Sequence, residues 1–246
     1  MDIAPPHSLE LSIVMPCLNE ADTVANCVRQ AFETLRRNGI SGEVVVADNG
    51  STDNSAALSR DAGARVVTTQ KRGYGRALSH GIREARGRYV VFADADGSYD
   101  FSEVPTFLHA LRQGFDLVHG CRLPAGNGTI MPGAMPFLHR WVGNPLLTLL
   151  ARVLFGAPVH DVYCGFKGVR HETFRKLSFV TSGMEFSTEL VLRMALKNRK
   201  IKEVPVTLYR DGRKNGRSHM RTIRDGLKTI AYFARELGSS PIPTEP

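Results

Sequence analysis

Short apolar runs alternate with helix-length segments over residues 11–120. The runs are LSIVMP (11–16), EVVVAD (43–48), RVVTT (65–69), YVVFAD (89–94) and DLVHG (116–120). Runs of this length between turn-forming residues predict buried strands. The intervening segments predict helices at roughly 20–38, 53–62, 74–86 and 102–113. Because strand and helix alternate, the pattern predicts an α/β fold with a doubly wound, mostly parallel sheet and right-handed crossovers.

The second half of the chain has a different pattern. Residues 123–136 are rich in glycine and proline and predict a loop. In the apolar segment 137–155, Asn144 and Pro145 predict a helix start and Gly156 its end. Further predicted elements are a helix over 185–199, a strand over 201–209, an amphipathic helix over 219–237 and a disordered tail at 239–246. The last helix carries an apolar stripe of Met220, Ile223, Leu227, Ile230, Ala234 and Leu237.

The run YVVFAD leads directly into two carboxylates, Asp94 and Asp96. Ligands bind beyond the carboxyl ends of parallel strands, so this pair falls where a site is expected. A hard cation such as Mg²⁺ or Mn²⁺ would offset the repulsion between the two charges and neutralise a diphosphate. Because a lone Asp-x-Asp is common, two solvated loop aspartates are the alternative.

Two more strand ends are polar. DNGSTD (48–53) places Asp48 where it could accept hydrogen bonds from a nucleobase or ribose, although capping of the next helix also explains the motif. Pro16, Asn19 and Glu20 line the neighbouring edge. RGYGRAL (72–78) offers Gly73 and basic residues at a helix start, a suitable neighbour for a diphosphate.

Composition narrows the class of protein. The 246 residues contain 42% hydrophobic residues, and no apolar run approaches the length of a membrane span. The four cysteines show no CxxC spacing, which predicts free thiols and a cytoplasmic location. Residues 197–236 hold twelve Lys or Arg and four acidic residues, an excess that equals the net charge of +8. This basic face predicts an anionic partner, such as a phosphorylated substrate, an acidic membrane surface or nucleic acid.

The ordered motifs IVMPCLNE, VVADNGSTD, RGYG and VVFADADGSYD resemble the family 2 glycosyltransferases with the GT-A fold. The later motifs GCRL, HDVYCGFKGVR, SGMEFSTELVLRM and EVPVTLYRDGR resemble the dolichyl-phosphate mannose and glucose synthase-like branch. The resemblance extends over about residues 10–235. It implies transfer of mannose or glucose from a nucleotide-sugar, GDP-mannose or UDP-glucose, to a dolichyl or undecaprenyl phosphate, with inversion at the anomeric carbon. The residues leave the base and the sugar open.

The resemblance also implies roles for individual residues. The nucleotide-sugar would contact Pro16, Asn19, Glu20, Asp48, Gly73, Asp94 and Ala95. Metal would bind Asp94 and Asp96, and the acceptor phosphate would contact Arg122, Arg140, Arg213 and Ser218. Asp96, Glu185 and Arg122 are the implied catalytic residues. One domain is expected over residues 1–238, with a nucleotide-sugar half at about 10–122 and an acceptor- and membrane-facing half at 123–238.

Many bacterial members of this branch continue into transmembrane helices, whereas this sequence ends at residue 246. Two segments offer another route to a lipid. The segment 137–155 is very apolar, and the helix over 219–237 flanks its stripe with cations, as interfacial helices do. The expected location is therefore peripheral, on the cytoplasmic face of the inner membrane. The alternative is that both helices simply pack on the sheet.

Two other functions remain open. The acceptor could be a soluble or protein hydroxyl, with Glu185 as its base. The chain could be a non-catalytic nucleotide-sugar binder that partners a separate transmembrane protein, although the intact Asp94 and Asp96 pair argues against this. Binding of nucleic acid is not expected, because no strand interleaves aromatic and basic residues.

Overall fold

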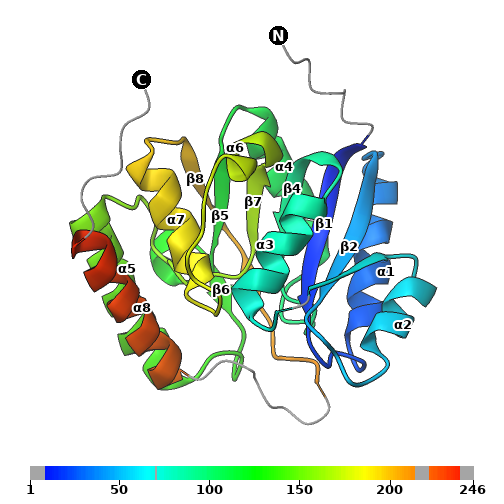
Figure 1. Ribbon diagram of the computed structural model, residues 1–246, viewed down its shortest axis with the longest axis horizontal. Helices are drawn as coiled ribbons and strands as arrows, with labels where there is room; N and C mark the ends of the chain where they lie inside the picture. Colours follow the sequence, from blue (N-terminus) through cyan, green and yellow to red (C-terminus); the bar gives the residue numbers. More distant parts are fainter. Residues whose placement is uncertain (1–8, 70, 214–221, 239–246) are drawn as a thin grey trace.

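The computed structural model describes residues 9–69, 71–213 and 222–238, and shows helices on both faces of a seven-stranded sheet (Figure 1). The strand order is β3-β2-β1-β4-β7-β5-β8. The strands are β1 (Leu9–Cys17), β2 (Gly42–Asp48), β3 (Arg65–Thr68), β4 (Gly87–Phe92), β5 (Leu117–Cys121), β7 (Lys167–Arg170) and β8 (Ile201–Pro205). The main helices are α1 (Val24–Arg37), α2 (Ser55–Asp61), α3 (Tyr74–Glu84), α4 (Val104–Arg112), α5 (Asn144–Phe155), α6 (His171–Arg175), α7 (Phe186–Leu196) and α8 (Thr222–Gly238).

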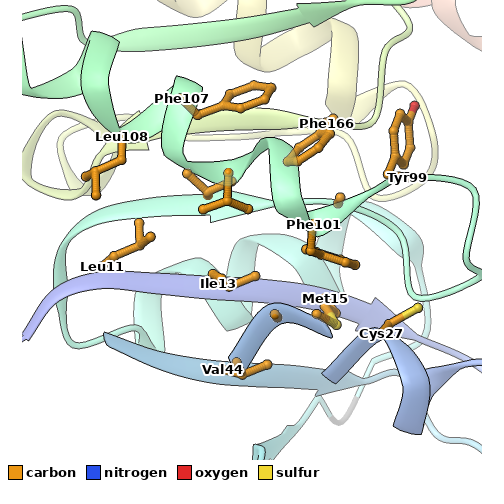
Figure 2. Packing of buried hydrophobic residues seen from close by; sticks show 14 of the residues in the cluster. Leu11, Ile13, Met15, Cys27, Val44, Tyr99, Phe101, Phe107, Leu108 and Phe166 are labelled. Atoms are coloured by element: carbon orange, nitrogen blue, oxygen red, sulfur yellow. The ribbon is translucent and has the colours of Figure 1, made fainter. Parts of the chain in front are cut away.

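The central strands are buried on both faces, which explains their continuous apolar runs. Alternate residues of β1 point to opposite sides, so Leu11, Ile13 and Met15 join one core while Val14 joins the other. The first core includes α1, α4 and a stack of Phe107 on Phe166 with ring centroids 4.4 Å apart (Figure 2). The second core lies under α3, α5, α7 and α8. The predicted α/β fold is confirmed.

Strand β7 was not predicted. It lies between β4 and β5 and runs antiparallel to both, with Tyr89 opposite Arg170 and Leu117 opposite Val169. Its sequence KGVR begins with a lysine, a residue that is rarely buried, so it gave no strand signal. The sheet is therefore mixed, although most of its neighbouring strands are parallel.

Several boundaries also differ from the predictions. Strand β4 ends at Phe92, so the acidic pair follows the strand in a loop. The loop predicted over 123–136 contains a short 3₁₀ turn (Pro124–Gly126) and β6 (Thr129–Ile130), which pairs with β9 (Thr207–Leu208). The single strand predicted over 201–209 is thus divided between two sheets.

The helix of the apolar segment has an unusual start. A π-helical turn, η3 (His139–Gly143), runs directly into α5, so Asn144 is the first residue of α5 and not its N-cap. Gly156 ends α5 with a positive φ of 64°, as predicted. Short π-helical segments are common at functional sites, so η3 is a candidate part of such a site.

The described part of the apolar stripe predicted on the last helix faces outward. Leu227 is 61% exposed, and Ile230 and Leu237 are also exposed, whereas Tyr232 and Phe233 are buried. Met220 and the tail 239–246 lie outside the described residues. Helix α8 packs on α5, where the Phe155 and Phe233 ring centroids are 5.3 Å apart (Figure 1). The described members of the stripe therefore do not pack on the sheet, although α8 contributes Tyr232 and Phe233 to the second core.

Segment 137–155 is divided between the core and the surface. Leu147 and Phe155 are buried, but Leu149 is 57% and Val153 is 72% exposed. The exposed large apolar side chains of η3 and the two residues before it, of α5 and of α8 are called the apolar set below. They are Phe137, Leu138, Trp141, Val142, Leu146, Leu149, Val153, Leu154, Leu227, Ile230 and Leu237. Within the described residues, none of the helices has the length and apolar character of a membrane span. All four cysteines are buried free thiols, as predicted.

Candidate active site

A cavity of about 480 Å³ opens at the carboxyl ends of β1, β2 and β4, the lower edge of the sheet in Figure 1. Its wall includes eight of the predicted site residues, namely Pro16, Glu20, Gly73, Asp94, Ala95, Asp96, Arg122 and Arg213. Among the described residues, Asn19, Asp48, Arg140 and Glu185 do not line it. Ser218 lies outside the described residues. The fold therefore brings together most, but not all, of the candidates.

Asp94 and Asp96 lie in the loop that follows β4. The phenol of Tyr74, the first residue of α3, donates a hydrogen bond of 2.9 Å to Asp94 Oδ1. The amide of Ser98 donates one of 2.9 Å to Asp96 Oδ1. Burial, and after it the charge of Asp96, raises the pKa of Asp94 to about 7. A nearby cation would offset the cost of ionising both carboxylates, so their environment favours cation binding.

The donor set at this loop fits a hard divalent cation. Mg²⁺ and Mn²⁺ prefer oxygen ligands and commonly use one or two carboxylates, with water and substrate phosphates as the remaining ligands. Among the described residues, no cluster of three or more His, Cys, Asp or Glu side chains could hold a metal ion. A cation at Asp94 and Asp96 would therefore depend on the substrate to complete its coordination.

Arg213 lies on the same side of the cavity as the acidic pair. Its Nε donates a hydrogen bond of 2.6 Å to Glu20 Oε2, and its Nη2 lies 3.7 Å from Asp96 Oδ2. A further amino group is paired with Asp211. The resemblance implied that Arg213 contacts the acceptor phosphate, whereas here its partners are carboxylates beside the candidate metal site. Glu20, expected to contact the nucleoside, is one of those partners.

The turn after β2 holds Asp48 away from the cavity. Its carboxylate accepts hydrogen bonds from the amides of Gly50 and Ser51, at 3.2 and 3.3 Å. These hydrogen bonds close the turn after β2 and do not cap α2, whose N-cap is Asn54 and has no side-chain capping bond, so the capping interpretation of DNGSTD is not confirmed. The next residue, Asn49, lines the cavity instead and accepts a hydrogen bond of 3.0 Å from the amide of Gly73. Asn49 was missed, because the motif directed attention to its charged neighbour.

Gly73 is required by local geometry. Its φ is +145°, and a Cβ atom there would lie 2.4 Å from the carbonyl oxygen of Ser182. No larger residue fits this position without moving the chain. Asn19 also has a positive φ, 56°, and its side chain accepts a hydrogen bond of 2.8 Å from the amide of Thr52. Asn19 therefore supports the turn at 51–53.

Arg122 reaches the cavity from the end of β5, but its guanidinium is already paired. Nε and Nη2 contact the two oxygens of Asp161 at 2.7 and 2.8 Å, and both residues are buried. Arg122 and hydrogen bonds hold the pKa of Asp161 well below its usual range, against the effect of burial. Arg140 lies on η3, where its guanidinium carbon is 5.0 Å from the Trp141 ring centroid. A phosphate bound by Arg122 or Arg140 would therefore share the guanidinium with Asp161 or with the Trp141 ring.

Glu185 precedes α7 and is buried. Its Oε1 accepts a hydrogen bond of 3.0 Å from the amide of Gly183, while Oε2 has no hydrogen-bond partner among the described residues. Glu189, one turn later, accepts hydrogen bonds from the amides of Val180 and Thr181, at 2.9 Å for each. Glu189 is thus a structural residue, whereas Glu185 keeps one oxygen available.

The cavity extends from the acidic pair toward η3 and α8. Its far wall includes residues that sequence reasoning did not select, namely Met135, Pro136, His139, Tyr163, Asp225 and Lys228. The rings of His139 and Tyr163 meet edge to face, with centroids 6.0 Å apart. Tyr163 lies in the motif HDVYCGFKGVR, but the sequence assigned no role to any of these residues, because η3 and α8 approach each other only in the folded chain.

Comparison with known proteins places these features in context. The family described as "Glycosyl transferase family 2" matches residues 12–178. Low-salt glycan biosynthesis hexosyltransferase Agl6 of Haloferax volcanii is 37% identical over 94% of this chain, and the chain spans 54% of that relative's length. Dolichyl-phosphate hexose transferase of the same organism is 33% identical, with 82% of this chain and 83% of that protein covered.

Solved structures share the fold. Glucosyl-3-phosphoglycerate synthase from Mycobacterium tuberculosis in complex with phosphoglyceric acid gives a TM-score of 0.73 at 21% identity, covering 95% of this chain and 81% of that chain. The same enzyme in complex with Mn²⁺, uridine diphosphate and glucosyl-3-phosphoglycerate gives a TM-score of 0.72 at 22% identity, with the same coverage. At this level of identity the likeness shows the fold alone.

Proposed function

The chain belongs to glycosyl transferase family 2, and from that premise we propose that it transfers a hexose from a nucleotide-diphosphate sugar to a polyprenyl phosphate at a membrane surface. The donor is GDP-mannose or UDP-glucose, and Mg²⁺ or Mn²⁺ is the cofactor. The acceptor class is supported by the relative that is named a dolichyl-phosphate hexose transferase. The metal is supported by the environment of Asp94 and Asp96 and by the Mn²⁺ held in a solved structure of the same fold.

One observation carries this proposal: a single cavity is lined both by the acidic pair and by residues of η3 and α8. The acidic end suits a metal-bound diphosphate. The other end adjoins the elements that bear the apolar set. A substrate with a phosphate head and a hydrocarbon tail matches this polarity, because its head would enter the cavity while its tail stays with apolar surroundings.

The apolar set also supports a membrane surface as the partner. Exposed apolar residues on monomeric proteins are usually scattered, so eleven on η3 with its two preceding residues, α5 and α8 require an explanation. Exposed cations accompany them, namely Arg152 on α5 and Arg224, Lys228 and Arg235 on α8. Each cation near an anionic surface contributes about 1 kcal/mol to binding. This arrangement fits a protein that lies on the cytoplasmic face of a membrane.

The chemistry needs little from a strong base. A phosphate monoester is largely ionised at neutral pH, with a second pKa near 6, and can attack the anomeric carbon directly. The protein's task is to hold two anionic substrates in line and to offset charge on the leaving diphosphate. A divalent cation on Asp94 and Asp96 would supply part of that charge. Attack opposite the leaving group would invert the anomeric carbon.

A second candidate is transfer to a soluble or protein hydroxyl, with Glu185 as the base. The unpartnered Oε2 of Glu185 favours this alternative. Against it, Glu185 is not among the described residues that line the cavity, and a hydroxyl acceptor would leave the apolar set without a role. A non-catalytic partner of a transmembrane protein would in turn leave the acidic pair without a role.

The proposal is tested by product formation. The purified protein is incubated with a panel of nucleotide-sugars, Mg²⁺ or Mn²⁺ and a short polyprenyl phosphate, and the lipid fraction is examined by mass spectrometry. The expected product is the acceptor plus one hexose. The matched control is the corresponding polyprenol, which lacks the phosphate and should not react. Equal glycosylation of the polyprenol would favour the hydroxyl-acceptor alternative, and no product with any donor would contradict the proposal.

A further inference from the structure

Four acidic side chains face one part of the cavity, and a single guanidinium contacts three of them. The acidic residues are Glu20, Asp94, Asp96 and Asp211. Arg213 donates to Glu20 through Nε and Nη2, is paired with Asp211 through Nη1, and lies 3.7 Å from Asp96. Its side chain is mostly buried, so solvent screens these contacts only in part.

The backbone fixes Arg213 at this place. The amide of Tyr209 donates a hydrogen bond of 2.9 Å to the carbonyl of Ser98, and the amide of Gly212 donates one of 2.8 Å to the carbonyl of Asp96. Residues 209–212 therefore run along the loop that carries the acidic pair. Since the tether is made by main-chain atoms, substitution of the Arg213 side chain leaves it in place.

This geometry sets a guanidinium and a divalent cation in competition. Both would interact with Asp96, and two cations that share one carboxylate repel each other across a few ångströms. A nucleoside diphosphate changes the balance, because its phosphate oxygens give the guanidinium new bidentate partners. The charge of the diphosphate also offsets that of both cations.

We propose that Arg213 couples metal binding to donor binding: it opposes the divalent cation when the cation binds by itself and favours it when the cation arrives with a nucleoside diphosphate. Glu20 and Asp211 hold the guanidinium ready for this exchange. Arg213 is thus a positioning residue on the donor side of the cavity. The inference deepens the proposed function and rests on its metal-dependent nucleotide site.

The test compares Mn²⁺ affinity with and without nucleotide, using calorimetry or the electron paramagnetic resonance signal of free Mn²⁺. The proteins are the wild type, Arg213→Gln, Arg213→Lys and the matched control Arg210→Gln. Arg210 lies three residues away but donates to the carbonyl of Pro132, at 2.6 Å, instead of to a carboxylate. UDP and GDP are the nucleotide probes.

We expect the effect of Arg213→Gln on Mn²⁺ affinity to reverse when nucleotide is present. With Mn²⁺ alone, Arg213→Gln should bind roughly tenfold more tightly than the wild type, because a neighbouring positive charge is removed. With Mn²⁺ and nucleotide together, the same variant should bind roughly tenfold more weakly, because a charge-assisted bidentate contact is lost. Arg213→Lys should lie between the two, and Arg210→Gln should follow the wild type.

Other outcomes would overturn the inference. An Arg213→Gln variant that matches Arg210→Gln in both conditions would show that Arg213 is not coupled to the metal. Weaker Mn²⁺ binding in both conditions would make Arg213 a structural support only. If Arg213→Gln unfolds too readily for titration, Arg213→Lys is compared with the wild type instead. If its effect on Mn²⁺ affinity does not reverse when nucleotide is added, Arg213 is not coupled to the metal. Failure of the wild type to bind Mn²⁺ with either nucleotide would instead overturn the proposed function, and this inference with it.

Discussion

The phenol of Tyr74 donates a hydrogen bond of 2.9 Å to Asp94, which joins the first residue of α3 to the loop after β4. The contact links two of the motifs seen in the sequence, RGYG and DADG. It also fixes one oxygen of a carboxylate whose charged form is disfavoured by burial, which raises the pKa of Asp94 to about 7. Tyr74 is therefore expected to orient Asp94 for a cation.

The substitution Tyr74→Phe removes only the hydroxyl group. We expect Mn²⁺ affinity in the presence of nucleotide to fall about tenfold or more, because a hydrogen bond to a charged group contributes roughly 1.5 kcal/mol or more. Calorimetric titration measures this directly. Unchanged affinity would mean that Asp94 needs no help from Tyr74 in its orientation.

The buried pair of Arg122 and Asp161 should be essential for folding. We expect Asp161→Ala to lower the free energy of unfolding by about 3–5 kcal/mol, because it leaves the Arg122 guanidinium buried without its carboxylate. Urea denaturation followed by circular dichroism measures the loss. The control is Glu172→Ala, which breaks an exposed pair with Lys176 and should change stability by about 1 kcal/mol or less. Equal effects would contradict the structural role assigned to Arg122.

Lys167 should give stability a distinctive pH dependence. Burial lowers the pKa of its ammonium from 10.5 to about 8. Between these values the unfolded chain keeps the proton that the folded chain has lost, so the unfolding free energy rises with pH. We expect the wild type to gain about 2 kcal/mol relative to Lys167→Met between pH 8 and pH 10.5. Parallel pH profiles for the two proteins would show that Lys167 does not titrate in this range.

The same lysine explains a limit of sequence reasoning. Most of the parallel strands could be predicted because they contain a short apolar run between polar turns, although β8 also carries Lys202 and Glu203. Strand β7 could not, because a chain pattern does not reveal that Cys164 and Ser187 will accept hydrogen bonds from the Lys167 ammonium. A buried lysine looks like a surface residue until its partners are known.

The candidate site divides in a similar way. The acidic pair, Glu20 and Gly73 were accessible from motifs, because each follows directly on a predicted strand or opens a predicted helix. The contact of Glu20 with Arg213 could not be predicted from motifs, because 193 residues separate the two in the sequence. The apolar stripe of α8 was visible in the sequence, but its helical period does not say which environment covers it. The structure leaves it facing outward.

The apolar set should govern access to the membrane. We expect Leu149→Glu with Val153→Glu to reduce binding to anionic lipid vesicles at least tenfold, because two exposed apolar contacts become charged at the surface. Thermal stability should stay near that of the wild type, since both side chains already face outward. The control Leu196→Glu alters an exposed apolar residue at the end of α7 and should leave vesicle binding unchanged. Vesicle sedimentation distinguishes these outcomes, and equal binding by all three proteins would exclude the apolar set from the membrane contact.

The acidic pair is the centre of the account, and a nucleotide titration tests it most directly. UDP and GDP are titrated calorimetrically into the wild type and Asp96→Asn, each with and without Mn²⁺, after circular dichroism has shown that both proteins are folded. We predict that one nucleotide binds the wild type, that Mn²⁺ strengthens this binding at least tenfold, and that Asp96→Asn loses the Mn²⁺ effect. Absence of binding by either nucleotide, with or without Mn²⁺, would contradict the account.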